Sequence, residues 1–137
     1  MPFADSQGVQ LYYEEAGKGL PIVFVHEFGG DIRSWEPQLS YFSRRYRCIA
    51  FNARGYPPSD VPDSVSQYSQ AIATDDIANV MRDLGVRKAH IIGCSMGGYA
   101  TLHFGLRYAS MARSLTVIGA GYGSDPDKRA RFLHDTE

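Results

Sequence analysis

Four short apolar runs punctuate the first 120 positions of the chain. They lie at residues 22–25, 48–52, 90–94 and 115–119. Unbroken apolar runs of this length are typical of parallel strands that are covered on both faces. Residues 8–21 instead alternate until Gly17, Gly19 and Pro21 interrupt the pattern, which predicts an antiparallel strand and a turn at a sheet edge.

Segments of helical length separate these runs. Ser34 is the expected N-cap of a first helix. Its apolar side is formed by Trp35, Leu39 and Phe42. A second helix is expected to stop at Gly85. Its apolar residues follow the spacing of a helix that packs on a sheet, namely Ile77, Val80, Met81 and Leu84. The segment from Ser95 to about Tyr108 is apolar nearly all round, as a buried helix would be.

Strands that alternate with helices in this way favour right-handed crossovers and an open, mostly parallel α/β sheet. The chain has 137 residues, of which 44% are hydrophobic and 21% charged. This composition is typical of one soluble globular domain with enough length to bury a core.

Charge and composition argue against several partners. Fourteen Lys and Arg against fifteen Asp and Glu give a net charge of −1, so no overall field favours nucleic acid or anionic lipid. The N-terminus lacks a secretory pattern and no apolar run approaches membrane-spanning length, so we expect no membrane association and a cytoplasmic location. Cys48, Cys94 and the four histidines lack metal-ligand spacing. We therefore expect no metal and no cofactor.

A serine stands between two glycines where a predicted strand turns into a predicted helix. The stretch Gly93-Cys94-Ser95-Met96-Gly97 fits the pattern G-x-S-x-G. A strained backbone can lift a serine hydroxyl above the sheet at such a turn, and the glycines let neighbouring backbone pass without collision. The N–H groups at the start of the helix could hold the oxyanion that forms when a serine attacks a carbonyl.

Three motifs in a fixed order carry a family resemblance. They are FVHEFGGDIRSW at 24–35, NARGYPPSD at 52–60 and GCSMGG at 93–98. They resemble the oxyanion loop, the arginine-glycine turn and the nucleophile elbow of the α/β-hydrolase fold superfamily, of the esterase, lactonase and perhydrolase kind. The resemblance implies an N-terminal portion only, with the first six strands of a mostly parallel, doubly wound sheet. Residues 1–123 would belong to the core, and 124–137 would begin a cap that is truncated together with the last two strands.

The resemblance also implies roles for individual residues. Ser95 would be the nucleophile, the amides of Phe28 and Met96 would form the oxyanion hole, and His26 would brace the loop that carries Phe28. The expected activity is cleavage of a small ester, thioester or lactone through an acyl-serine intermediate. Glu27 departs from the family, whose loops usually have glycine there. This departure keeps open a second hypothesis, a non-hydrolytic small-molecule receptor or binding protein on the same fold.

The catalytic acid and base are harder to find. In the family they follow the serine in the order acid, then histidine. His90 and His103 are poorly placed by their distance along the strand and helix, and His134 is nearly terminal. Asp125 and Asp127 follow the last apolar run, but Asp125 before Pro126 reads better as a helix N-cap. We therefore expect a complementary C-terminal fragment of the same protein to supply both groups, and this fragment alone to be inactive.

Arg54 lies in the second motif. We expect its side chain to secure the turn through backbone carbonyls or to anchor an acidic substrate.

Overall fold

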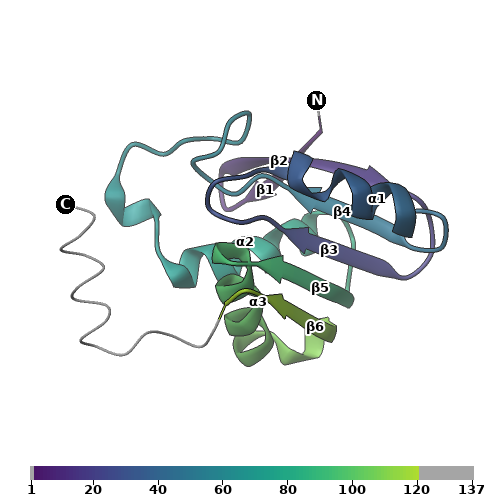
Figure 1. Cartoon of the computed structure of the whole chain (residues 1–137). Helices are drawn as coiled ribbons and strands as arrows, with labels where there is room; N and C mark the ends of the chain where they lie inside the picture. The colour runs from purple at the N-terminus through teal and green to yellow at the C-terminus, as the bar shows by residue number, and fades with distance from the viewer. Residues whose placement is uncertain (1, 121–137) are drawn as a thin grey trace.

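A computed structural model describes residues 2–120. Their six strands are β1 (Phe3–Ser6), β2 (Val9–Ala16), β3 (Pro21–Val25), β4 (Arg47–Phe51), β5 (Ala89–Cys94) and β6 (Ala112–Ile118). They form one sheet in the order β1-β2-β4-β3-β5-β6 (Figure 1). The strands β4, β3, β5 and β6 run parallel, whereas β1 and β2 are antiparallel to their neighbours. This confirms the mostly parallel α/β sheet.

All four apolar runs form parallel strands, and the alternating segment forms β2. The pattern did not reveal β1, a strand of four residues that pairs with β2 through Ala4 opposite Leu11. Both of these residues are fully buried, but the other apolar residue of β1, Phe3, is exposed, and one buried apolar side chain in four residues is too weak a signal to mark a strand. The outer strand on this side is therefore β1 and not β2.

Helices cover both faces of the sheet, as the doubly wound arrangement requires. The α-helices are α1 (Glu36–Phe42), α2 (Gln70–Asp83) and α3 (Met96–Arg107). In Figure 1, α1 lies on one face while α2 and α3 lie together on the other. Single 3₁₀ turns occur at η1 (Ile32–Trp35), η2 (Val65–Gln67) and η3 (Ala109–Met111). Within residues 2–120, no helix is both long enough and apolar enough to cross a membrane.

The capping prediction is right for the end of α2 and wrong for the first helix. The helix α2 ends at Asp83, two residues before Gly85, which has a φ of +70°. On the opposite face Asp31 caps the 3₁₀ turn η1, since its carboxylate accepts from the amide two residues on, and Ser34 lies inside that turn. The helix α1 follows directly, and its N-cap residue Trp35 makes no side-chain cap bond. The Ser34 hydroxyl instead donates to Glu27 Oε1 at 2.5 Å. Both Asp and Ser are good caps, but the turn begins directly after Asp31 and therefore includes Ser34.

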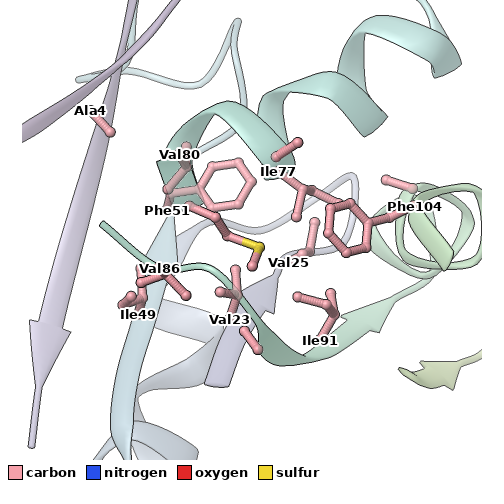
Figure 2. Close-up of a cluster of buried hydrophobic side chains, with 14 of the residues drawn as sticks. Ala4, Val23, Val25, Ile49, Phe51, Ile77, Val80, Val86, Ile91 and Phe104 are labelled. Atoms are coloured by element: carbon pink, nitrogen blue, oxygen red, sulfur yellow. The ribbon is translucent and has the colours of Figure 1, made fainter. Parts of the chain in front are cut away.

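Two apolar cores result from the alternation of side chains along the strands. Figure 2 shows the larger core, in which strand residues such as Val23, Ile49 and Phe51 meet Ile77 and Phe104 of the helices α2 and α3. The smaller core lies under α1. It contains Ile22, Phe24, Ile32, Trp35, Leu39, Cys48 and Ala50. The sheet is therefore anchored from both sides, which holds the carboxyl ends of β3, β4 and β5 in fixed positions.

The strand β6 departs from the expectation of a strand covered on both faces. Most of its residues are exposed, including Leu115 and Ile118. Among the described residues β6 pairs only with β5, so it forms one edge of the sheet. An edge that exposes apolar side chains is a site where further chain can pair.

A buried ion pair ties the turn after β4 to α2. Arg54 Nε and Nη2 donate to the two carboxylate oxygens of Asp76 at 2.8 and 2.7 Å. The Ser6 hydroxyl donates to the same carboxylate at 2.6 Å, and Arg54 Nη1 donates to the Gln67 carbonyl at 3.0 Å. The guanidinium is thus held by the Asp76 carboxylate and by the backbone and side-chain oxygens of Gln67, so the expected carbonyl anchoring is only part of its role.

We predict that Arg54→Met lowers the free energy of unfolding by about 3–5 kcal/mol, because it leaves the Asp76 carboxylate buried without its counter-charge. Urea denaturation of the purified protein measures this difference. The matched control is Arg33→Met, which removes an exposed ion pair with Asp31 and should cost under about 1 kcal/mol. Equal losses in the two variants would contradict the prediction.

Candidate active site

Ser95 lies between β5 and α3 in a backbone conformation that residues other than glycine rarely adopt. Its φ is +52° and its ψ is −115°. Within residues 2–120, Gln7 is the only other non-glycine residue with a positive φ. The Ser95 amide donates to the Ile118 carbonyl at 2.8 Å, and the Ser95 carbonyl accepts from the Tyr99 amide at 3.0 Å. These bonds hold the strained backbone, and the serine is exposed at the end of the sheet.

The two glycines that flank this turn permit very close backbone contacts. A Cβ atom on Gly93 would lie 2.2 Å from the Gly97 carbonyl oxygen, and one on Gly97 would lie 2.2 Å from the Val25 carbonyl oxygen. Neither contact is possible for a real side chain, and main-chain oxygens cannot move aside cheaply. The spacing G-x-S-x-G therefore lets the first turn of α3 lie directly against the end of β3.

The residues expected to form the oxyanion hole come from these two adjoining segments. Met96 is the first residue of α3, so its N–H has no partner within the helix and lies at the positive end of the helix dipole. Phe28 follows β3 and is 75% exposed. The Tyr56 hydroxyl donates to the Phe28 carbonyl at 2.7 Å and lies 3.7 Å from Met96 Sδ. One side chain thus contacts both residues.

His26 is buried and uses both of its ring nitrogens. Its Nε2 accepts from the Ala53 amide at 3.0 Å, so the proton resides on Nδ1, which donates to the Glu27 carbonyl at 2.7 Å. Burial lowers the pKa of His26, although the Glu27 carbonyl and the nearby acidic charges act in the opposite direction. The imidazole is therefore neutral, and neither nitrogen is available to take a proton from Ser95.

The His26 hydrogen bond fixes the direction of the Phe28 amide. The Glu27 carbonyl and the Phe28 N–H belong to the same peptide group, which is planar and trans, so they point in opposite directions. That carbonyl accepts from His26 Nδ1 and also from the Gly30 amide at 3.3 Å. With the oxygen held by two donors, the N–H must point away from both of them.

Glu27 occupies the loop without disturbing its backbone. Its φ is not positive, and its carboxylate is folded toward Ser34 and Gly30. A Cβ on Gly30 would lie 1.8 Å from Glu27 Oε1, so glycine at position 30 makes room for the carboxylate. Glu27 does not line the cavity beside the site. The glutamate at position 27, which kept the receptor hypothesis open, is thus explained by local structure.

A cavity of about 640 Å³ opens beside Phe28 and Met96. Its apolar wall includes Val25, Phe51, Tyr56, Val61, Ala73 and Ala100. Arg54 and Asp76 also line it, but they are bonded to each other. Ser95 itself does not line the cavity, whereas its neighbours Met96 and Gly97 do.

Other residues considered in the sequence lie apart from Ser95 or outside the described range. His90 is near the start of β5, where its Nδ1 lies 2.6 Å from Ser114 Oγ. His103 is in the middle of α3. Asp125, Asp127, His134 and the expected cap segment 124–137 lie outside residues 2–120. Among the described residues no cluster of three or more His, Cys, Asp or Glu could hold a metal ion.

Comparison with known proteins identifies the fold. The family described as alpha/beta hydrolase fold matches residues 21–134. The chain belongs to this family. The hydrolase-fold chain is 31% identical over 119 residues to Epoxide hydrolase 3 of Mus musculus, a match that covers 85% of the chain and 32% of the relative. It is 32% identical over 99 residues to 3-oxoadipate enol-lactonase 1 of Acinetobacter baylyi, covering 72% of the chain and 36% of the relative.

A solved structure agrees with these matches. The enol-lactonase from Burkholderia xenovorans superposes with a TM-score of 0.80 at 27% identity, covering 85% of the hydrolase-fold chain and 45% of the lactonase chain. The chain thus spans about a third to a half of the length of these relatives.

Sequence reasoning missed two residues of this hydrolase-fold site, Tyr56 and Asp76. Tyr56 lies inside the quoted motif NARGYPPSD, so its position near the oxyanion loop was available from the resemblance. Its hydroxyl contact was not, because it depends on how two loops pack. Asp76 is one of two adjacent acids on α2, and the helical spacing of that segment places it on the side of the buried Ile77 and Val80. That burial was the signal that it needed a cationic partner.

We predict that unfolding stability falls as the pH drops below about 6.5, the pKa of a histidine in an unfolded chain. Below that pH, His26 binds a proton in the unfolded chain but not in the folded protein. The free energy of unfolding therefore changes with a slope of up to about 1.4 kcal/mol per pH unit. Urea denaturation between pH 7.5 and 5.5 measures the slope, and His26→Asn should remove this share of it.

The control for that measurement is Val23→Ala, which opens a cavity in the core. It should lower stability at every pH and leave the slope unchanged, since Val23 does not titrate. If His26→Asn keeps the full slope, the histidine does not titrate as described.

Proposed function

We propose that the protein is a serine hydrolase that cleaves a small ester, thioester or lactone through an acyl intermediate on Ser95. The observation that carries the proposal is the strained, exposed Ser95 at the end of β5, next to the first amide of α3, which has no partner within that helix. Strain of this kind costs about 1–3 kcal/mol and tends to be kept where function requires it.

The proposed reaction has two stages. Ser95 Oγ attacks the substrate carbonyl and loses its proton to a base, while the amides of Phe28 and Met96 hold the negative oxygen. The tetrahedral intermediate expels its alcohol or thiol, which takes up a proton, and leaves an ester on Ser95. Water then attacks that ester by the same route and releases the acid. His26 braces the oxyanion loop in this scheme and does not act as the base, because both its nitrogens are bonded.

The identity of the nucleophile favours a carbonyl substrate over an epoxide. A serine oxygen that opened an epoxide would form an ether, which water does not readily cleave, so the enzyme would remain blocked. A serine oxygen that attacks an acyl group forms an ester, which water can cleave. We therefore infer a reaction nearer to that named for the lactonase relative than to that named for the epoxide hydrolases.

The cavity beside Phe28 and Met96 supports a neutral, largely apolar substrate. Its one guanidinium, on Arg54, already donates to the Asp76 carboxylate through two nitrogens and to Gln67 through the third. An anionic substrate would have to break that buried pair in order to use Arg54. We infer that the cavity holds an apolar part of the substrate by burial.

We propose that the catalytic acid and histidine come from polypeptide that follows residue 137 in the same protein. Among residues 2–120, the histidines nearest to Ser95 in sequence are His90 and His103, on the strand before it and the helix after it. The exposed Leu115 and Ile118 on the edge strand β6 are consistent with further strands that pair there.

Activity-based labelling tests the nucleophile. We expect a fluorophosphonate to form a covalent bond with Ser95 in the complete protein, and Ser95→Ala to lose labelling and at least about 10³-fold in kcat on a p-nitrophenyl ester. Ser110→Ala, which changes an exposed serine on η3, should behave as wild type. Tight binding of a small molecule without turnover, unaffected by Ser95→Ala, would favour a receptor instead. Turnover of styrene oxide without turnover of any ester would exclude the acyl mechanism.

Co-expression tests the proposed partner segment. Residues 1–137 expressed alone should hydrolyse no ester, and activity should appear when the following polypeptide is supplied in the same cell. Intact-mass and size measurements accompany the assay. A soluble, monomeric 15.2 kDa species with esterase activity of its own would refute the proposal.

A further inference from the structure

Tyr56 is fixed to the turn after β4 by its own backbone. Its amide donates to the Ala53 carbonyl at 3.0 Å, and its carbonyl accepts from the Ser59 amide at 3.0 Å. Its ring packs edge-on against the His26 imidazole, with centroids 4.7 Å apart. The side chain therefore extends from a rigid base toward the loop after β3.

The Tyr56 hydroxyl meets the two residues whose amides are proposed to hold the oxyanion. A phenol has one proton, and the Phe28 carbonyl at 2.7 Å is a much better acceptor than the Met96 sulfur at 3.7 Å. The proton is accordingly given to Phe28 while the sulfur packs against the oxygen. Burial and the charge of Glu27 raise the pKa of Tyr56, so the hydroxyl stays a donor.

With the bond from the Tyr56 hydroxyl, hydrogen bonds fix the orientation of two successive peptide groups. His26 and Gly30 hold the carbonyl of the peptide that ends in the Phe28 N–H. Tyr56 holds the carbonyl of the next peptide, on the other side of the same Cα. The exposed Phe28 side chain supplies little packing. The orientation of the Phe28 amide therefore depends on these main-chain bonds.

We propose that Tyr56 is a positioning residue, which holds the Phe28 amide toward the oxyanion through its hydroxyl bond to the Phe28 carbonyl and keeps the loop against Met96. The inference rests on the proposed function, since it concerns the same reaction. Tyr56 does not touch the reacting atoms in this scheme. Its hydroxyl lowers the barrier by limiting the motion of a donor that acts in the transition state.

The test is Tyr56→Phe in the complete protein, which keeps the ring contact with His26 and removes only the hydroxyl. We expect kcat on a p-nitrophenyl ester to fall about tenfold, less than the roughly 10²–10³-fold that follows loss of a whole oxyanion donor. The KM should stay within about twofold, because the contact matters only once charge develops. The affinity for a trifluoromethyl ketone, which forms a tetrahedral oxyanion on serine, should fall in parallel with kcat.

The matched control is Tyr108→Phe, which removes a half-buried hydroxyl that donates to Asp75 near the far end of α3. It should leave kcat and ketone affinity unchanged even if it lowers stability. An unchanged kcat in Tyr56→Phe, or a raised KM at constant kcat, would overturn the positioning role. So would a loss of kcat without loss of ketone affinity.

Failure of the proposed function can be distinguished from failure of the positioning role of Tyr56. If wild-type protein neither hydrolyses the ester nor is labelled at Ser95 by a fluorophosphonate, the acyl mechanism is wrong. If wild type is active and labelled while Tyr56→Phe is unaltered, only the positioning inference is wrong. Should Tyr56→Phe fold poorly, its ketone affinity is measured on the folded fraction isolated by gel filtration, and unchanged affinity there also overturns the inference.

Discussion

The site depends on the backbone of Ser95, which is held at a positive φ that costs about 1–3 kcal/mol for a residue with a side chain. The strain persists because the surroundings determine the conformation from several directions. The Ser95 amide is bonded to β6, its carbonyl is bonded within α3, and α3 begins in direct contact with the end of β3 at Gly97. The exposed hydroxyl is therefore a product of how a helix packs on a parallel sheet, and not of a loop that could adjust by itself.

A second constraint follows from that contact. Because α3 approaches β3 so closely, the loop after β3 lies beside the start of α3. In the proposed mechanism the amide of that loop and the first amide of α3 hold the same oxygen. Peptide planarity makes this possible with few groups, since a donor that holds a carbonyl also sets the N–H across the same bond. His26 holds one such carbonyl and Tyr56 the next. His26 also accepts a hydrogen bond from the turn after β4, and Tyr56 is part of that turn.

The sequence predicted what depends on local period and on backbone sterics. Continuous apolar runs located the parallel strands, and the glycines around Ser95 indicated the tight turn. Features that depend on distant partners were not predictable. The 3₁₀ turn that includes Ser34, whose hydroxyl donates to Glu27, was not marked by the pattern. The burial of Arg54 follows from an acid 22 residues further along the chain. The strand β1 was missed because its stability comes from pairing with β2 more than from its own pattern.

In the proposed mechanism, the charges near Ser95 leave the stabilisation of the oxyanion to amide dipoles. Arg54 is paired with Asp76, and the Glu27 carboxylate accepts from Ser34. His26 is buried and neutral, and its one ring proton is donated to the Glu27 carbonyl. Under the proposed mechanism, the described groups that would face a developing negative oxygen are therefore neutral N–H donors. Such donors carry a smaller desolvation penalty than a buried cation, and they are already oriented when charge appears. An unpaired arginine at the same place would bind anions in the ground state, and that binding would not accelerate the reaction.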